Sequence, residues 1–241
     1  MRGFTIEFGA IVPVEVTVAD ITTDCCDVLH EGQSVCWHSK YKDVFRDLCI
    51  SCNSPCRVYS AKSRPRFGKL VKFKKLNPGD AIPFKQAIAA TGENLQKVYA
   101  KIPSMDCSNC GECCRNFSID LYFIEYLQIL EFIKRKFSPS EFNRIKGLCG
   151  MELAIENRGL VNMRRCPFRD ENRKICMINE VKPLVCRQYQ CEKVEGAEGL
   201  VCGGRAENHE MISSFSDNFF IVRDREVLIF KVNELNRWFL L

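Results

Sequence analysis

Cysteines are the residues of this sequence whose type and spacing could do chemistry. The chain has 241 residues and 16 cysteines, and an excess of this kind indicates either disulfide bonds or metal ligands. The densest group is Cys107-Ser-Asn-Cys110-Gly-Glu-Cys113-Cys114. Two-residue spacing lets successive thiolates of one loop converge on a single metal centre, and Gly111 gives the loop the backbone freedom to wrap around it. We therefore predict a metal centre at this loop.

Cys113 and Cys114 are adjacent, and neighbouring cysteines rarely point at the same tetrahedral ion. We expect one of them to complete the local ligand set. The other would serve a second centre, bridge two centres, or take no part in metal binding.

More cysteines follow in a distinctive order. Cys166 precedes Pro-Phe, Cys176 precedes Met-Ile, Cys186 ends Pro-Leu-Val-Cys and is followed by arginine, and Cys191 comes last. With the CxxCxxCC loop, this order resembles the zinc- or iron-chelating CxxCxxCC family, also called YkgJ-like, over about residues 105 to 192. The resemblance implies that cysteines of this set bind a metal ion or an iron-sulfur cluster.

Two positions depart from the family pattern. Asn179 stands where family members usually have tyrosine, and Lys182 stands where they have the arginine before proline. We expect the contacts of these two side chains to differ from those of the family. Some relatives are linked to flagellin lysine methylation, so the resemblance also implies, as an alternative, a protein-modifying enzyme of the lysine methylase kind.

The spacing within the loop favours iron-sulfur over zinc. Ferredoxin-type 4Fe-4S clusters are commonly held by a Cys-x2-Cys-x2-Cys loop and one remote cysteine, whereas zinc sites tend to use two separated pairs. We expect a 4Fe-4S cluster, with zinc as the alternative. The expected ligands are Cys107, Cys110, Cys113 and one of Cys166, Cys176 or Cys186. Four arginines near these cysteines either offset the charge of a cluster or lie on the surface: Arg115, Arg164, Arg165 and Arg187.

A second group of cysteines lies in the first half of the chain. Cys36, Cys49, Cys52 and Cys56 supply four sulfurs that could close a second metal site. This prediction rests on spacing alone. His38 and the adjacent pair at 25 and 26 make a mixed ligand set an alternative.

The first residues show no charged segment followed by a long apolar run, and no apolar run is long enough to cross a bilayer. We therefore expect a cytoplasmic protein, in which cysteines are ligands rather than disulfides. The sequence contains no Walker A loop, no Gly-x-Gly-x-x-Gly and no His-Glu-x-x-His, and it has three histidines. We assign no catalytic residue.

A basic stretch follows the first cysteine group. Between Cys49 and Gly79 there is no acidic residue, whereas seven lysines and arginines stand from Lys62 to Lys75. Such a run can bind a phosphate backbone or an acidic partner. We expect a solvated strand face here, with a hairpin at Asn77-Pro78-Gly79-Asp80.

The elements that position the cysteines follow from hydrophobic spacing. Alternating apolar residues predict strands at 4 to 8 and 12 to 18, and residues 84 to 98 read as a helix. From 123 to 137 one helical face is apolar, with Glu125, Gln128, Glu131 and Arg135 turned away. Ser138-Pro139-Ser140-Glu141 predicts the start of another helix, and residues 219–222 and 227–232 predict a terminal hairpin.

These elements indicate an α+β fold with two domains. Residues 1–100 would form a small β-rich domain that contains cysteines, and residues 101–241 a mainly helical metal-binding domain that ends in the hairpin. The expected function is electron transfer, or assembly or activation of a larger metalloenzyme. The alternative is a structural zinc module with a basic contact surface. In either case we expect a protein partner rather than nucleic acid or a membrane.

Overall fold

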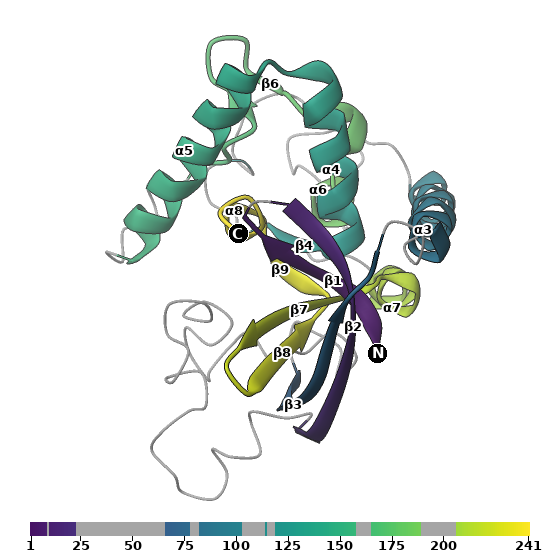
Figure 1. Cartoon of the computed structure of the whole chain (residues 1–241). Helices are drawn as coiled ribbons and strands as arrows, with labels where there is room; N and C mark the ends of the chain where they lie inside the picture. Colours follow the sequence, from purple (N-terminus) through teal and green to yellow (C-terminus); the bar gives the residue numbers. More distant parts are fainter. Residues whose placement is uncertain are drawn as a thin grey trace, which may run out of the picture. The chain divides into compact units, whose positions relative to one another are not determined.

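The computed structural model describes residues 1–8, 10–22, 66–77, 82–102, 114, 119–157, 165–188 and 206–241. Helices and strands are both present, as the predicted α+β class requires (Figure 1). The chain forms two compact units, which we call the barrel unit and the cysteine unit. The barrel unit comprises Met1–Ala89 and Ser213–Val232, and the cysteine unit comprises Ala90–Ile212 and Asn233–Leu241.

Five strands form a closed barrel in the order β1-β2-β3-β8-β7. They are β1 (Arg2–Glu7), β2 (Ala10–Thr22), β3 (Arg66–Lys75), β7 (Asn218–Arg223) and β8 (Glu226–Phe230). Neighbouring strands are antiparallel except for β1 and β7, which pair in parallel. The larger part of the cysteine unit, Ala90–Ile212, is thus inserted in the sequence between the third and fourth strands of the barrel, and the rest follows the last of them. The hairpin predicted near the carboxyl end is confirmed, and it completes this sheet.

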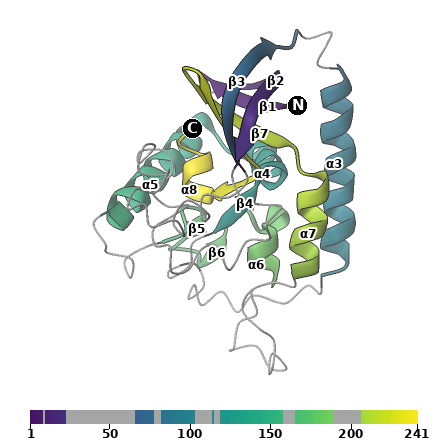
Figure 2. The ribbon, with the colours of Figure 1, turned by 90° about the horizontal axis from the view of Figure 1, so that it is seen from below.

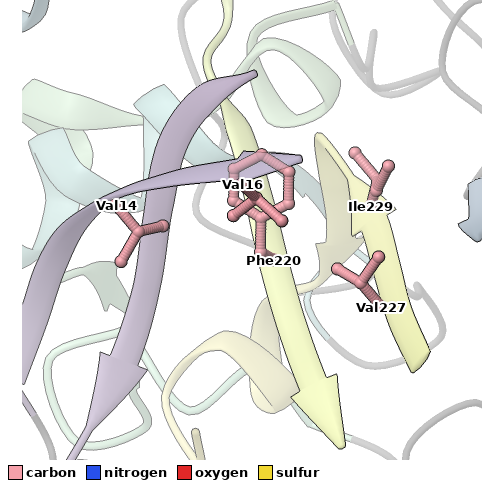
Figure 3. Packing of buried hydrophobic residues seen from close by; sticks show 5 residues of the cluster. All are labelled: Val14, Val16, Phe220, Val227 and Ile229. Carbon is pink, nitrogen blue, oxygen red and sulfur yellow. The ribbon is translucent and has the colours of Figure 1, made fainter. Parts of the chain in front are cut away.

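The core of the barrel comes from inward-facing residues on three strands. Val14 and Val16 of β2 pack with Phe220 of β7 and with Val227 and Ile229 of β8, and all five are buried. Figure 3 shows these five side chains gathered between the strands. The period-two spacing of valines along β2 therefore does mark the inner face, as the sequence predicts.

The described part of the basic stretch, Arg66–Lys75, forms β3. Leu70 and Phe73 both contact the barrel core although they are three residues apart. The register explains this, because the pairing with β2 shifts at Val71 and leaves that residue as an exposed bulge. Lys69 forms an ion pair with Asp20 at 3.0 Å. A carboxylate thus already lies beside part of this basic charge.

The prediction of a hairpin around residues 77 to 80 is wrong. Residues 78–81 lie outside the described part, but the chain is strand β3 before them and helix α3 (Ile82–Ala100) after them. The partners of β3 are β2 and β8 rather than a following strand. The Asn-Pro-Gly-Asp sequence therefore follows the end of strand β3 and does not connect it to a second, paired strand.

The cysteine unit contains helices and two short sheets. Strand β4 (Asp120–Tyr122) pairs with β9 (Val232–Glu234), and β5 (Arg169–Asp170) pairs with β6 (Ile175–Cys176). Figure 2 shows β4 beside the yellow β9 and α8. The helical elements after α3 are α4 (Phe123–Lys136), α5 (Pro139–Asn157), the 3-10 turn η5 (Asn179–Val181), α6 (Leu184–Gln188), α7 (Ala206–Phe215) and α8 (Leu235–Trp238).

Aromatic side chains form the centre of the cysteine unit. The ring of Trp238 lies 5.2 Å from that of Tyr126 in a stacked arrangement and 5.4 Å from that of Phe123. The indole N–H of Trp238 donates to the carbonyl oxygen of Leu121 at 3.0 Å. Phe239 contacts the ring of Phe168 at 5.4 Å. Helix α8 and Phe239, the residue after it, therefore join α4 to the chain that follows Cys166.

The predicted start of α5 is confirmed in atomic detail. The backbone N–H of Ser138 donates to the Glu141 carboxylate at 2.7 Å, and the N–H of Glu141 donates to the Ser138 hydroxyl at 3.3 Å. Pro139 is the first residue of the helix. These reciprocal bonds form a capping box, which satisfies two of the donors that a helix start leaves open.

The capping box predicts a pH dependence. The pKa of Glu141 is lowered from its ordinary value of 4.5, first by the backbone N–H and then by the hydroxyl of Ser138. A carboxyl whose folded pKa is lowered contributes stability above its unfolded pKa, and this is lost as the pH falls through the folded value. The stability lost in Glu141→Gln should therefore be largest near neutral pH and shrink in acid. Chemical denaturation at a series of pH values would measure it.

Glu131→Gln provides the control, because Glu131 is exposed on α4. A stability difference between wild type and Glu141→Gln that stayed constant from neutral to acid pH would contradict this account of the cap.

Candidate metal centre

Cys166 and Cys176 are held together by the β5–β6 hairpin. Cys176 lies opposite Arg169 in the register, and the N–H of Arg169 donates to the carbonyl oxygen of Cys166 at 3.0 Å. The hairpin loop is fixed by Asp170, whose carboxylate accepts the N–H groups of the second and third residues after it at 3.0 Å each. Asp170 is thus the residue that turns the chain between the two cysteines.

The CxxCxxCC loop ends beside Cys166. The backbone N–H of Cys166 donates to the carbonyl oxygen of Cys114 at 2.6 Å. Cys114 is the last residue of the loop motif and the one cysteine of that motif within the described residues. This bond brings two parts of the chain that are remote in sequence to the same place, as a shared metal centre requires.

Three further cysteines influence the thiol of Cys166. Burial raises the pKa of this thiol well above its ordinary value, and the negative charges of Cys186, Cys176 and Cys149 raise it further. These three thiols are thus within electrostatic range of that of Cys166. The structure holds all of them as thiols rather than as disulfides, and the same is true of Cys114.

The raised pKa has a chemical meaning for ligand binding. A buried thiol keeps its proton in the absence of a cation, whereas a coordinated metal ion displaces that proton and leaves the thiolate bound. Thiolates are soft ligands that suit zinc and iron-sulfur clusters. The chemistry of these donors thus fits the predicted cofactors.

Cys186 is carried by the short helix α6, whose first residue is held by Glu125. The carboxylate of Glu125 accepts the backbone N–H of Leu184 at 2.6 Å and the hydroxyl of Tyr99 at 2.5 Å. It also accepts the N–H of Tyr122 at 3.0 Å. Burial raises the pKa of Glu125, although these hydrogen bonds act in the opposite direction. One carboxylate therefore joins α3, α4 and α6.

The prediction that Glu125 faces away from the apolar side of its helix is wrong. Glu125 is 1% exposed. A second face of helix α4 is buried besides the predicted apolar one. Glu125 lies on this second face with Ile129 and Phe132, four and seven residues later. This i, i+4, i+7 spacing was the available signal. Glu131 of the same helix is exposed, as expected.

Arg187 places a positive charge next to Cys186. Its guanidinium carbon lies 4.1 Å from the ring centroid of Tyr99, a distance typical of a cation–π interaction. Its Nε–H donates to the carbonyl oxygen of Lys182 at 2.6 Å, and an Nη2–H donates to that of Glu180 at 3.2 Å. Lys182 thus contributes its backbone carbonyl oxygen to this contact with Arg187. The contact does not use the Lys182 side chain.

Arg165 behaves differently from Arg187. Its guanidinium is exposed and lies 4.0 Å from the carboxylate of Glu171. Its backbone N–H, however, donates to the carboxylate of Glu152 at 2.7 Å. Glu152 is buried on α5, so a second buried carboxylate holds the chain one residue before Cys166.

Several predicted ligands lie outside the described residues. In the second half of the chain these are Cys107, Cys110, Cys113 and Cys191, together with Arg115 and Arg164; in the first half they are Cys36, Cys49, Cys52 and Cys56. Within the part that the structure describes, no three thiol, imidazole or carboxylate groups are placed so that they could hold a metal ion. The described sulfurs do not complete a site by themselves.

Comparison with known protein families gives a match over the same part of the chain. Residues 106–211 match the CxxCxxCC family, described as a "Putative zinc- or iron-chelating domain". The resemblance predicted from the cysteine order is thereby confirmed, and metal binding by this segment is supported. No curated protein and no solved structure matched the chain. Among the described helices, none combines the length and the apolar character needed to cross a membrane.

Proposed function

We propose that the cysteine unit binds a 4Fe-4S cluster and serves electron transfer, or the assembly or activation of a larger metalloenzyme, through a protein partner. The proposed ligands are Cys107, Cys110, Cys113 and one of Cys166, Cys176 or Cys186. The observation that carries this proposal is the hydrogen bond from Cys166 to Cys114, because it joins the end of the tight loop to the remote cysteines.

The surrounding residues suit an anionic cofactor. A 4Fe-4S cluster supplies one-electron redox chemistry and carries negative charge from its thiolates. Arg187 is fixed beside Cys186 by Tyr99 and two backbone carbonyls, so its charge can offset that of a bound thiolate.

Zinc is the second candidate, and the family description is consistent with it because it names zinc beside iron. Zinc has no redox chemistry, so the cysteine unit would then be a structural module. Unfolding of this unit on chelation is expected in that case.

Metal and sulfide analysis of the full chain, purified without oxygen, separates these candidates. We expect iron and acid-labile sulfide in equal amounts, with broad visible absorbance. Cys110→Ser should lose the absorbance of this cluster and keep only what the second centre proposed below contributes, whereas Cys202→Ser, outside the predicted ligand sets, should keep all of it. Zinc without sulfide would establish the second candidate, and protein that takes up neither zinc nor iron would refute both.

We further propose a second centre at Cys36, Cys49, Cys52 and Cys56. Metal content per chain should then fall by about half in the double variant Cys49→Ser, Cys52→Ser. Unchanged metal content would refute the second centre and leave the first untouched.

A further inference from the structure

Two buried glutamates make the same kind of contact beside two of the cysteines. Glu125 of α4 accepts the backbone N–H of Leu184, two residues before Cys186. Glu152 of α5 accepts the backbone N–H of Arg165, one residue before Cys166. Both carboxylates are buried, with exposed fractions of 1% and 6%.

Burying a carboxylate costs free energy, and hydrogen bonds to the charged form offset that cost. In both cases a donor comes from the backbone of a cysteine-bearing segment. These segments have little regular structure of their own. Helix α6 has five residues, which is too short to be stable without tertiary contacts, and Cys166 precedes the two-residue strand β5.

From this arrangement we propose that Glu125 and Glu152 are positioning residues of the metal centre, which fix the backbone at Cys186 and Cys166 before any metal binds. The inference rests on the proposed metal-binding function and deepens it. Metal sites need their ligands within a narrow range of positions, and groups that orient ligands affect affinity strongly. Helices α4 and α5 supply the rigid base from which both carboxylates reach.

The contacts of Glu125 extend beyond a single bond. Its carboxylate also accepts a hydrogen bond from the hydroxyl of Tyr99. The guanidinium of Arg187 in turn lies over the ring of Tyr99. The residues on both sides of Cys186 are thus connected to the same carboxylate, directly at Leu184 and through Tyr99 at Arg187. Loss of this carboxylate would release the segment from both sides.

The test uses the full chain, reduced and stripped of metal, with zinc and cobalt(II) alone as probes. Glu125→Gln and Glu152→Gln keep the size of the side chain but remove its charge. We expect each to weaken zinc binding about 10- to 100-fold, measured by competition with a chromophoric chelator. The thiolate-to-cobalt absorbance should also change in energy or intensity, since it reports how the sulfurs are arranged around the ion.

Two control variants separate positioning from general stability. Glu131→Gln makes the same substitution at an exposed site of α4. Ile145→Val removes one methyl group from a buried position of α5 and should lower stability by about 0.5–1.5 kcal/mol. Both are expected to bind zinc and cobalt as the wild type does.

Wild-type affinity and spectra in both glutamine variants would overturn the inference while leaving the proposed function intact. An equal loss of affinity in Ile145→Val would also overturn it, because stability alone would then explain the effect. If Glu125→Gln fails to fold, Tyr99→Phe removes one donor to the same carboxylate and should give a smaller loss of affinity. Wild-type protein that binds neither ion would overturn this inference, and the iron and sulfide analysis described above would decide the proposed function separately.

Discussion

Replacing Trp238 with alanine is expected to lower the free energy of unfolding of the cysteine unit by about 3–5 kcal/mol. Trp238 is completely buried, and its ring contacts those of Tyr126 and Phe123. The substitution leaves a cavity among these rings and removes the hydrogen bond to the carbonyl oxygen of Leu121. Chemical denaturation, with hydrogen exchange in α4 and α5 as the local readout, would measure the loss.

Two further variants make this prediction specific. Trp238→Phe keeps an aromatic ring but removes this buried donor to the Leu121 carbonyl, so it should cost about 1–3 kcal/mol. Met151→Ala truncates an apolar side chain that is 59% exposed on α5 and should change stability by less than about 0.5 kcal/mol. Equal effects of Trp238→Ala and Met151→Ala would contradict the packing described for α8.

Gly3→Ala is expected to destabilise the barrel unit by about 3 kcal/mol, the upper part of the usual range for overpacking. Gly3 pairs with Asn218 where β1 and β7 close the barrel. A Cβ atom at Gly3 would overlap the carbonyl oxygen of Asn218 and lie 2.5 Å from Cε2 of Phe220. The oxygen belongs to the backbone of the partner strand, so it cannot move without disturbing the pairing.

Gly92→Ala is the matched control for Gly3→Ala. A Cβ atom at Gly92 would have no neighbour within 4 Å, and the residue lies inside helix α3. Alanine is more favourable than glycine inside a helix by roughly 1 kcal/mol. The Gly92→Ala variant should therefore be as stable as the wild type or more stable. Hydrogen exchange of the β1 and β7 amides would show whether the Gly3 variant opens the barrel. Unchanged protection there would refute the predicted clash.

The local elements could be predicted because their signals lie within a few residues. The capping box at Ser138 and Glu141 needs only four consecutive positions, and the hairpin of β7 and β8 needs two apolar runs and a polar turn. The pairing of distant strands could not be predicted in this way. The pairing of β3 with β8 joins residues such as Phe67 and Leu228, and hydrophobic alternation in either strand carries no mark of the other.

For the candidate site, the sequence points to a set of ligands, which stays a prediction, but not to the residues that support them. Cysteine type and spacing point to thiolate chemistry because few other roles need so many sulfurs together. Glu125 was missed because a charged residue at the edge of an apolar helical face normally faces water. Its burial depends on donors from Tyr99 and Leu184, which lie on other elements and become neighbours only in the folded chain.

The interrupted barrel sets an order of events during synthesis. Strands β1, β2 and β3 leave the ribosome early, but their partners β7 and β8 follow only after Ala90–Ile212, the larger part of the cysteine unit, has been translated. At about 5–20 residues per second this delay is on the order of ten seconds. Over that interval the nascent chain exposes unpaired strand edges, which are prone to aggregation, while the cysteines that we propose as ligands emerge.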